Sequence, residues 1–243
     1  MSTSRATWSA PRLPVAIAIA VMVVGIVAVL VVLIDNDVLR RFDEGVIASV
    51  RAEPLVAPFG WLHAATDLGG TPWVATLAVV VGVAEVAAGR RGVGLAAAAT
   101  IGLASLANSS LKLVVARARP DELAPIVVEP GYSFPSGHSL SAMVAYGVMA
   151  ILIGRSSLPA ALRAALIAGL ATLVVVVGLS RVYLGAHYPT DVLGGWLMGF
   201  AWITLFAALS AGIDPRFSVA RASAATAAGA DPGARRSDPP APR

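Results

Sequence analysis

The sequence predicts an all-α membrane protein, a polytopic helical bundle of six transmembrane helices with one interfacial amphipathic helix. Hydrophobic residues make up 57% of the 243 residues and charged residues only 13%, and the mean hydropathy is +0.79. Such values are typical of a chain embedded in lipid. Apolar stretches of roughly 17 to 24 residues recur along the chain, the length that crosses a hydrocarbon core of about 30 Å.

The first apolar stretch covers residues 13–34 and follows a short segment, residues 1–12. It is longer than a signal-peptide core and no small-residue cleavage pattern follows, which favours a retained anchor over a cleaved signal. Residues 35–70 contain charges and prolines, which argue against a span. Apolar residues nevertheless recur there at helical spacing and predict the interfacial amphipathic helix; they are Phe42, Val46, Ile47 and Val50.

The remaining five stretches complete the membrane domain, for which we expect the bounds 13–213. They cover residues 71–88, 92–115, 139–153, 162–179 and 192–211. Residues 214–243 are rich in Ala, Gly, Pro and Arg without periodicity. That composition predicts a disordered tail.

Arginines in the short connections predict the orientation of the chain, because positive residues are retained on the cytoplasmic side. Two loops and the two terminal segments would share that side. The terminal segments carry Arg5 and Arg12, and Arg216 and Arg221; the loops carry Arg90 and Arg91, and Arg155 and Arg163. Both termini are therefore predicted to be cytoplasmic in a multi-pass protein of the cell membrane. The extracytoplasmic side would hold residues 35–70, 116–135 and 180–190. The last two segments also contain basic residues, which indicates that those residues serve another purpose.

Composition also excludes several kinds of site. The chain has no cysteine, so a disulfide framework, a thiolate nucleophile and a cysteine metal site are all absent, and the redox compartment stays open. The net charge of +4 comes from arginines at the ends of the apolar stretches and in the tail. This distribution suits anionic lipid headgroups, and no nucleic-acid motif occurs. No carboxylate cluster suggests a magnesium site, so we expect neither a metal nor a cofactor.

The first segment with a chemical signature runs from Lys112 to Pro120. Lys112 is the only lysine in the chain, and it lies near the end of an apolar stretch, where an unpaired charge is costly. Arg119 follows seven residues later, so a continuing helix would place both cations on one face, where they could bind a single anion. The alternative is a snorkelling lysine beside interfacial arginines.

The second segment, residues 132–139, precedes the fourth apolar stretch. Pro135, Ser136 and Gly137 should begin that helix, whose unpaired backbone amides can bind phosphate oxygens. Ser136 supplies a hydroxyl, Gly137 allows close approach of the backbone, and His138 adds a titratable group. The alternative is a simple helix cap by Ser136.

The third segment, residues 180–191, contains His187 and Asp191 four residues apart. The carboxylate can hold the imidazole in one tautomer, and an imidazole so held can attack phosphorus. Pro189 argues against an ideal helix across the pair, so we expect the contact where a helix begins. The alternative is an interfacial histidine and a capping aspartate. Arg181 adds a cation to the same face, whereas His63 is given no role.

Together these segments resemble the three signature motifs of the type 2 phosphatidic acid phosphatase superfamily, KxxxxxxRP, PSGH and SRxxxxxHxxxD, and the apolar composition resembles its membrane branch. The resemblance implies that His187 forms a phosphohistidine intermediate, that Asp191 orients it, and that His138 protonates the leaving oxygen. It also implies a metal-free reaction. The residues that would hold the phosphate are Lys112, Arg119, Ser136, Gly137 and Arg181.

The expected partner is a membrane lipid phosphate, hydrolysed on the extracytoplasmic face. Bacterial members that the chain resembles favour polyprenyl (undecaprenyl) pyrophosphate, with phosphatidylglycerol phosphate and phosphatidic acid as alternatives. A lipid phosphotransferase, in which a hydroxyl replaces water, fits the same residues. A lipid-binding or transport protein without catalysis is the rival from another class, but such a protein would be expected to lose His138, His187 or Asp191, and all three are present. No motif predicts the oligomeric state.

Overall fold

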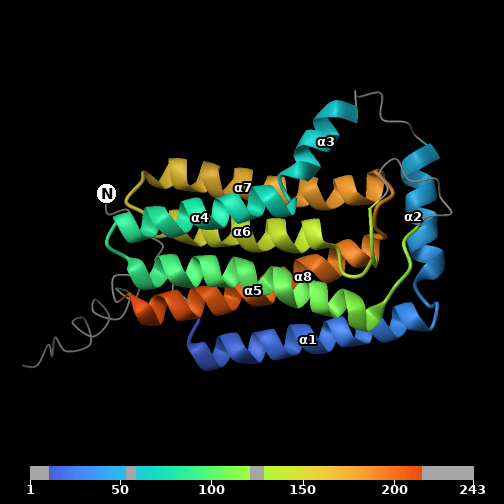
Figure 1. Ribbon diagram of the computed structural model, residues 1–243, viewed down its shortest axis with the longest axis horizontal. Helices are drawn as coiled ribbons and strands as arrows, with labels where there is room; N and C mark the ends of the chain where they lie inside the picture. The colour runs from blue at the N-terminus through green and yellow to red at the C-terminus, as the bar shows by residue number, and fades with distance from the viewer. Residues whose placement is uncertain (1–10, 53–58, 121–128, 215–243) are drawn as a thin grey trace, which may run out of the picture.

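The computed structural model describes residues 11–52, 59–120 and 129–214, and the elements in these ranges are helices without any strand. This confirms the all-α class. The predicted tail lies outside the described residues, as does nearly all of the segment 1–12. The helices are α1 (Leu13–Asp35), α2 (Arg40–Ala52), α3 (Phe59–Asp67), α4 (Thr71–Ala87), α5 (Arg91–Val115), α6 (Gly137–Gly154), α7 (Ala160–Tyr183) and α8 (Pro189–Ile213) (Figure 1).

Five of the helices, α1, α5, α6, α7 and α8, are each long and apolar enough to cross a membrane. Helix α4 has only 17 residues. It reaches the length of a span together with residues Trp61–Asp67 of α3, across a bend of 51°. The prediction of six spans therefore holds only if this bent pair is one span. The predicted amphipathic segment contains two helices, α2 and α3, in place of one.

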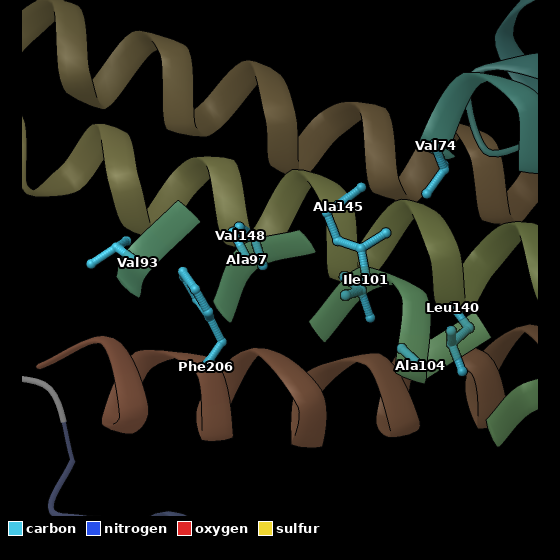
Figure 2. Packing of buried hydrophobic residues seen from close by; sticks show 10 residues of the cluster. Val74, Val93, Ala97, Ile101, Ala104, Leu140, Ala145, Val148 and Phe206 are labelled. Atoms are coloured by element: carbon cyan, nitrogen blue, oxygen red, sulfur yellow. The ribbon is translucent and has the colours of Figure 1, made fainter. Parts of the chain in front are cut away.

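Small residues allow the helices to approach closely. A Cβ atom on Gly94 of α5 would lie 2.6 Å from the carbonyl oxygen of Gly82 on α4, so only glycine fits at that crossing. Close packing of small residues is the usual source of helix association where lipid surrounds the protein. A hydrophobic cluster between α4, α5, α6 and α8 fills the interior (Figure 2), and its buried members include Val74, Val93, Ala97, Ile101, Ala104, Leu140, Ala145, Val148 and Phe206.

The long helices lie side by side, so their connections gather at two ends of the bundle (Figure 1). One end holds the α4–α5 and α6–α7 turns and the end of α8. The opposite end holds α2, α3, the segment between α5 and α6, and the turn between α7 and α8. The three motif segments of the sequence therefore meet at this second end, which α2 crosses at a steep angle to the bundle.

Candidate active site

The first motif segment leaves its helix after Lys112. Helix α5 ends at Val115, as the predicted stretch 92–115 indicated, and Ala116 adopts a left-handed conformation (φ 49°) with its N–H on the Lys112 carbonyl oxygen. Arg119 therefore does not share a helical face with Lys112, as it would if the helix continued. Both cations nevertheless reach the same loop. Lys112 Nζ donates to the carbonyl oxygens of residues 132 and 133, at 2.6 and 3.2 Å, and Arg119 donates to those of residues 130 and 131, at 3.1 and 2.8 Å.

The second motif segment begins helix α6, as predicted. Ser136 is the N-cap, and its Oγ accepts from the backbone N–H of Ser139 at 3.4 Å and from Ser139 Oγ at 3.0 Å. Ser136 is fully buried, and its own N–H donates to the backbone oxygen of Asp191 at 3.0 Å. A Cβ atom on Gly137 would lie 3.3 Å from Asn108 Nδ2, so the backbone is closely approached there. Ser136 therefore does cap α6, and it also ties α6 to α8.

The third motif segment places His187 and Asp191 together where a helix begins, which confirms the predicted contact. Helix α8 begins at Pro189, and Asp191 in its first turn accepts the N–H of Tyr188 at 2.9 Å, which closes a capping box. Asp191 Oδ2 lies 3.4 Å from His187 Nδ1, and both side chains are buried. The prediction that Arg181 lies in a loop is wrong, because α7 continues to Tyr183.

The second ring nitrogen of His187 faces a guanidinium. Arg119 Nη1 lies 3.3 Å from His187 Nε2 and donates to the carbonyl oxygen of Ala186 at 2.7 Å. Burial lowers the pKa of His187 to about 4, and Lys112 and Arg119 add to this lowering, while Asp191 opposes it. With Asp191 accepting at Nδ1, the neutral ring carries its proton there, and a lone pair remains on Nε2.

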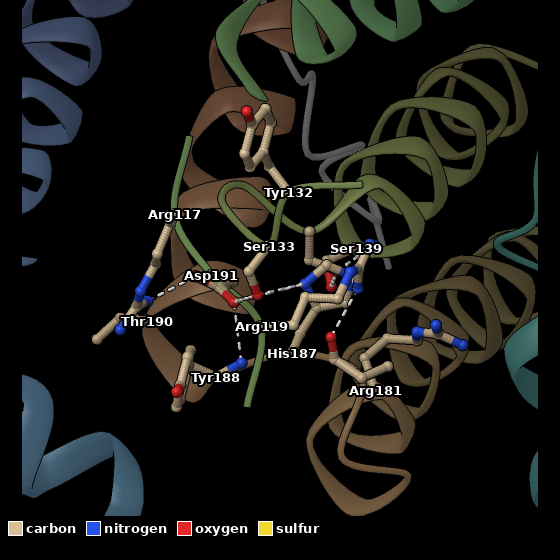
Figure 3. Close-up of polar contacts among 12 residues, drawn as sticks. Arg117, Arg119, Tyr132, Ser133, Ser139, Arg181, His187, Tyr188, Thr190 and Asp191 are labelled. Atoms are coloured by element: carbon tan, nitrogen blue, oxygen red, sulfur yellow. Dashed lines mark hydrogen bonds and ion pairs between the residues drawn. The ribbon is translucent and has the colours of Figure 1, made fainter. Parts of the chain in front are cut away.

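Ser133, which sequence reasoning did not single out, also contacts this pair. Ser133 Oγ donates to Asp191 Oδ2 and lies 3.4 Å from His187 Nδ1 (Figure 3). Its backbone N–H donates to the carbonyl oxygen of Arg117 at 2.8 Å, which ties the segment before α6 to the segment after α5. The only signal for Ser133 was its place three residues before Ser136 in the second motif segment.

Arg117, a second residue missed, links Asp191 to helix α2. Its Nη1 donates to Asp191 Oδ1 at 2.6 Å (Figure 3). Its Nη2 donates to Asp43 Oδ2 at 2.7 Å. Burial opposes the charge of Arg117, but the carboxylates of Asp191 and Asp43 outweigh this and raise its pKa. Asp43 was detectable in principle, because it lies on the same helical face as Val46 and Ile47, where a carboxylate is unexpected.

Arg181 lies at the other side of the site and binds an acidic residue. Its Nη2 donates to Glu129 Oε1 at 2.6 Å and its Nη1 to Thr66 Oγ1 at 2.9 Å, and the side chain is 1% exposed. Arg181 Nε is buried and has no acceptor among the described groups. His138, in the first turn of α6, interacts electrostatically with both Arg181 and His187. The structure thus brings these three predicted residues to one region.

The structure therefore brings together a central group of predicted residues. His187 contacts both Asp191 and Arg119, and the backbone N–H of Ser136 donates to the backbone oxygen of Asp191. Lys112 is not in direct contact with this group through the hydrogen bonds described; it donates to carbonyl oxygens of the neighbouring loop. Within the described ranges, no three side chains of His, Cys, Asp or Glu converge to hold a metal ion.

Known proteins match this chain over the region that contains the site. The profile described as the PAP2 superfamily matches residues 93–213, which include all three motif segments. Phosphatidylglycerophosphatase B of Bacillus subtilis is 39% identical over 138 residues, which are 55% of this chain and 66% of that protein. Undecaprenyl-diphosphatase of Sulfolobus acidocaldarius is 33% identical over 119 residues, which are 47% of this chain and 53% of that protein. The chain thus spans about half to two thirds of the length of these two relatives.

A solved structure shares the fold at greater coverage. The crystal structure of a transmembrane PAP2 type phosphatidylglycerolphosphate phosphatase from Bacillus subtilis superposes with a TM-score of 0.73 and 30% sequence identity. The superposition covers 80% of this chain and 97% of that chain. With the matched profile, the three motif segments and the shared helical arrangement in agreement, the chain belongs to the PAP2 superfamily.

Proposed function

We propose that the protein is a phosphatase that hydrolyses the phosphate or pyrophosphate of a membrane lipid through a phosphohistidine on His187. The observation that carries this proposal is the arrangement of the imidazole, with Nδ1 beside the Asp191 carboxylate and Nε2 beside Arg119. A buried, neutral imidazole whose free nitrogen faces a cation is placed to attack an anionic phosphorus centre. The relatives named as lipid phosphatases support the same reading.

In the proposed first step, the Nε2 lone pair of His187 attacks phosphorus, and the bond from phosphorus to the lipid oxygen breaks. His138 gives its proton to that oxygen, and Asp191 stabilises the charge that develops on the imidazole. In the second step a water gives its proton to His138 and attacks phosphorus, which breaks the N–P bond and releases inorganic phosphate. Each step uses side chains and water, so we expect activity to persist in EDTA.

The phosphate itself would be held by cations and by the start of α6. Arg181 already binds the Glu129 carboxylate, so its donors are placed to hold an oxyanion. Arg119 lies beside the attacking nitrogen, where it can stabilise charge on the phosphate oxygens of the transition state. The remaining proposed donors are Lys112, Ser136 and the backbone amide of Gly137.

The proposed site faces the extracytoplasmic side of the cell membrane, with both termini cytoplasmic. The basis is the distribution of arginine: the end of the bundle away from the site holds Arg90 and Arg155 in its turns, and Arg91 and Arg163 where α5 and α7 begin. Short loops rich in arginine stay on the cytoplasmic side. A lipid whose phosphate lies at the outer surface could then reach the site directly.

Two substrates are the leading candidates. Polyprenyl (undecaprenyl) pyrophosphate is the substrate that we expected by analogy with bacterial members of the family, and the name of the Sulfolobus relative favours it. Phosphatidylglycerol phosphate is favoured by the names of the two Bacillus matches. Phosphatidic acid presents the same terminal phosphate and is a third candidate.

The test is phosphate release by purified full-length protein in detergent with EDTA, for all three lipids, comparing wild type with His187→Ala. We expect release by wild type and a loss of at least about 1,000-fold in the variant. Adding a hydroxylated lipid acceptor separates hydrolysis from phosphotransfer, since transfer would yield a phosphorylated acceptor in place of free phosphate. Equal release by wild type and variant, or turnover of no lipid, would contradict the proposal.

A further inference from the structure

Helix α2 carries a carboxylate that none of the three motifs contains. Asp43 is 0% exposed, whereas Arg40, Arg41 and Ser49 of the same helix are exposed. Its Oδ1 accepts the backbone N–H of Thr190 at 3.1 Å, and its Oδ2 accepts Thr190 Oγ1 at 2.6 Å and Arg117 Nη2 at 2.7 Å. Asp43 therefore accepts hydrogen bonds from both the first turn of α8 and the segment after α5.

Arg117 bridges two buried carboxylates. One nitrogen of its guanidinium donates to Asp43, and the other donates to Asp191 at 2.6 Å and to Thr190 Oγ1 at 2.8 Å. The guanidinium also stacks over the Tyr188 ring, 4.2 Å from the ring centre. The planar guanidinium is held at both terminal nitrogens and on one face, so it has little freedom to move. Its position is therefore set by Asp43 as much as by Asp191.

The contact continues from Asp191 to the imidazole. While Oδ1 of Asp191 is held by Arg117, Oδ2 accepts from Ser133 and from the N–H of Tyr188, and it lies 3.4 Å from His187 Nδ1. The orientation of this carboxylate thus depends on Arg117 at one oxygen. An unbroken series of contacts leads from α2, through Arg117 and Asp191, to His187.

We infer that Asp43 is a positioning residue for the reaction: it holds Arg117 across the two carboxylates, and so fixes Asp191 against His187. This inference rests on the proposed phosphatase function. It assigns to α2 a part in catalysis. Asp43 itself touches neither the imidazole nor the region of the phosphate-binding residues.

Charge gives the inference a signature that a purely structural role would lack. Asp43 and Asp191 are negative and Arg117 is positive, so the group carries one net negative charge near His187. In Asp43→Asn, Asp191 is the only carboxylate that still binds Arg117. The negative potential at His187 becomes weaker, so the imidazole becomes less basic. Arg117→Gln removes the positive charge and makes the imidazole more basic. The acid limb of kcat/KM should therefore move to lower pH in the first variant and to higher pH in the second.

Other charged or titratable groups near His187 are unchanged in both variants, so the opposite shifts can be assigned to this pair. Substrate ionisation is also common to all of the variants. The groups concerned are Lys112 from α5, Arg119 from the segment after it, Glu129, His138 from the first turn of α6, Arg181 from α7, and Tyr188 before α8.

The test compares Asp43→Asn with Glu44→Gln, a matched control that removes the same charge from the neighbouring, half-exposed position of α2. Both are made in the full-length protein and assayed with a lipid that wild type hydrolyses. We expect Asp43→Asn to lower kcat by roughly 10- to 100-fold, the size of effect that loss of an outer hydrogen-bond partner has at histidine–metal sites, with KM nearly unchanged. We expect Glu44→Gln to match wild type.

Equal kcat and equal acid limbs in Asp43→Asn and Glu44→Gln would overturn the inference, as would shifts of the limb in the same direction in Asp43→Asn and Arg117→Gln. If Asp43→Asn does not give folded protein by size-exclusion chromatography, Arg117→Lys is tested in its place. The lysine ammonium keeps the positive charge but cannot donate to both carboxylates as the planar guanidinium does. A kcat equal to wild type in that variant would also overturn the inference. Failure of the phosphatase function itself would be seen separately, as unchanged release by His187→Ala.

Discussion

Arg117 and the buried Asp191 form an ion pair, with Nη1 of the arginine 2.6 Å from Oδ1 of the aspartate. This pair occupies one oxygen of the carboxylate and leaves the other for Ser133 and His187. Asp191 is therefore held on both sides, which fits a carboxylate whose task is to orient an imidazole.

Ser133 should contribute to activity through Asp191. Ser133→Ala removes the hydroxyl that donates to Asp191 Oδ2 and leaves a buried carboxylate oxygen with one donor fewer. We expect kcat to fall by about tenfold and the free energy of unfolding to fall by about 1 to 3 kcal/mol. Ser141→Ala, a change of the same kind in the second turn of α6, is the control. A Ser133→Ala variant with the kcat of wild type would show that the hydroxyl does not assist the pair.

The low pKa of His187 predicts how stability depends on pH. The pKa of His187 is about 4 in the folded protein, against 6.5 in an unfolded chain. Between these values the unfolded state binds more protons, so wild type should lose stability as the pH falls from about 6.5 to about 4. His187→Gln lacks this group, so the melting temperature of wild type should fall further than that of the variant over this window. Parallel curves would contradict the low pKa.

Gly195 should be essential for the packing of α8 on the start of α6. A Cβ atom there would lie 2.7 Å from the carbonyl oxygen of Ser136 and 3.1 Å from the N–H nitrogen of Leu140. We expect Gly195→Ala to lower the free energy of unfolding by about 1 to 3 kcal/mol and to reduce activity, because Ser136 must shift. Gly169→Ala, on α7, is the matched control, since nothing lies within 4 Å of its Cβ. Equal melting temperatures in the two variants would contradict the packing argument.

The absence of cysteine makes the orientation directly testable. Tyr132→Cys lies in the segment before α6, at the end of the bundle that holds the site, and Ser157→Cys lies in the turn between α6 and α7 at the opposite end; both positions are exposed. In intact cells, we expect a membrane-impermeant maleimide to label the first variant and to label the second only after permeabilisation. The reverse pattern would place the site on the cytoplasmic side.

The sequence was most informative where a single segment carries the physical signal. Apolar length located the spans to within a few residues, and Ser136 and Asp191 marked the starts of two helices correctly. The bend between α3 and α4 was not predictable, because α3 is short and its polar residues hid its continuity with the apolar stretch that follows. The end of α5 at Val115 agrees with the predicted stretch 92–115, but the left-handed conformation of Ala116, which directs the chain toward Arg119, gives no signal in the sequence.

The residues that contact the predicted site residues were harder to predict from the sequence. Asp43 and Arg117 are 74 residues apart and meet only through the tertiary packing of α2. Glu129 meets Arg181 in the same way. Spacing along one helix can predict a contact such as that of His187 with Asp191, whereas contacts between distant segments require the fold. A carboxylate in an apolar stripe, as at Asp43, was the one hint that the sequence offered.

The central claim, that His187 carries the phosphoryl group, is tested most directly by trapping the intermediate. Full-length protein is mixed with a lipid labelled with ³²P in its terminal phosphate and is quenched in alkali within milliseconds. We expect a protein-bound label that is stable in alkali and labile in acid, that maps to the peptide containing His187, and that is absent from His187→Ala. A wild-type protein that turns over the lipid without such a label, or a label that persists in His187→Ala, would show that His187 does not carry the phosphoryl group.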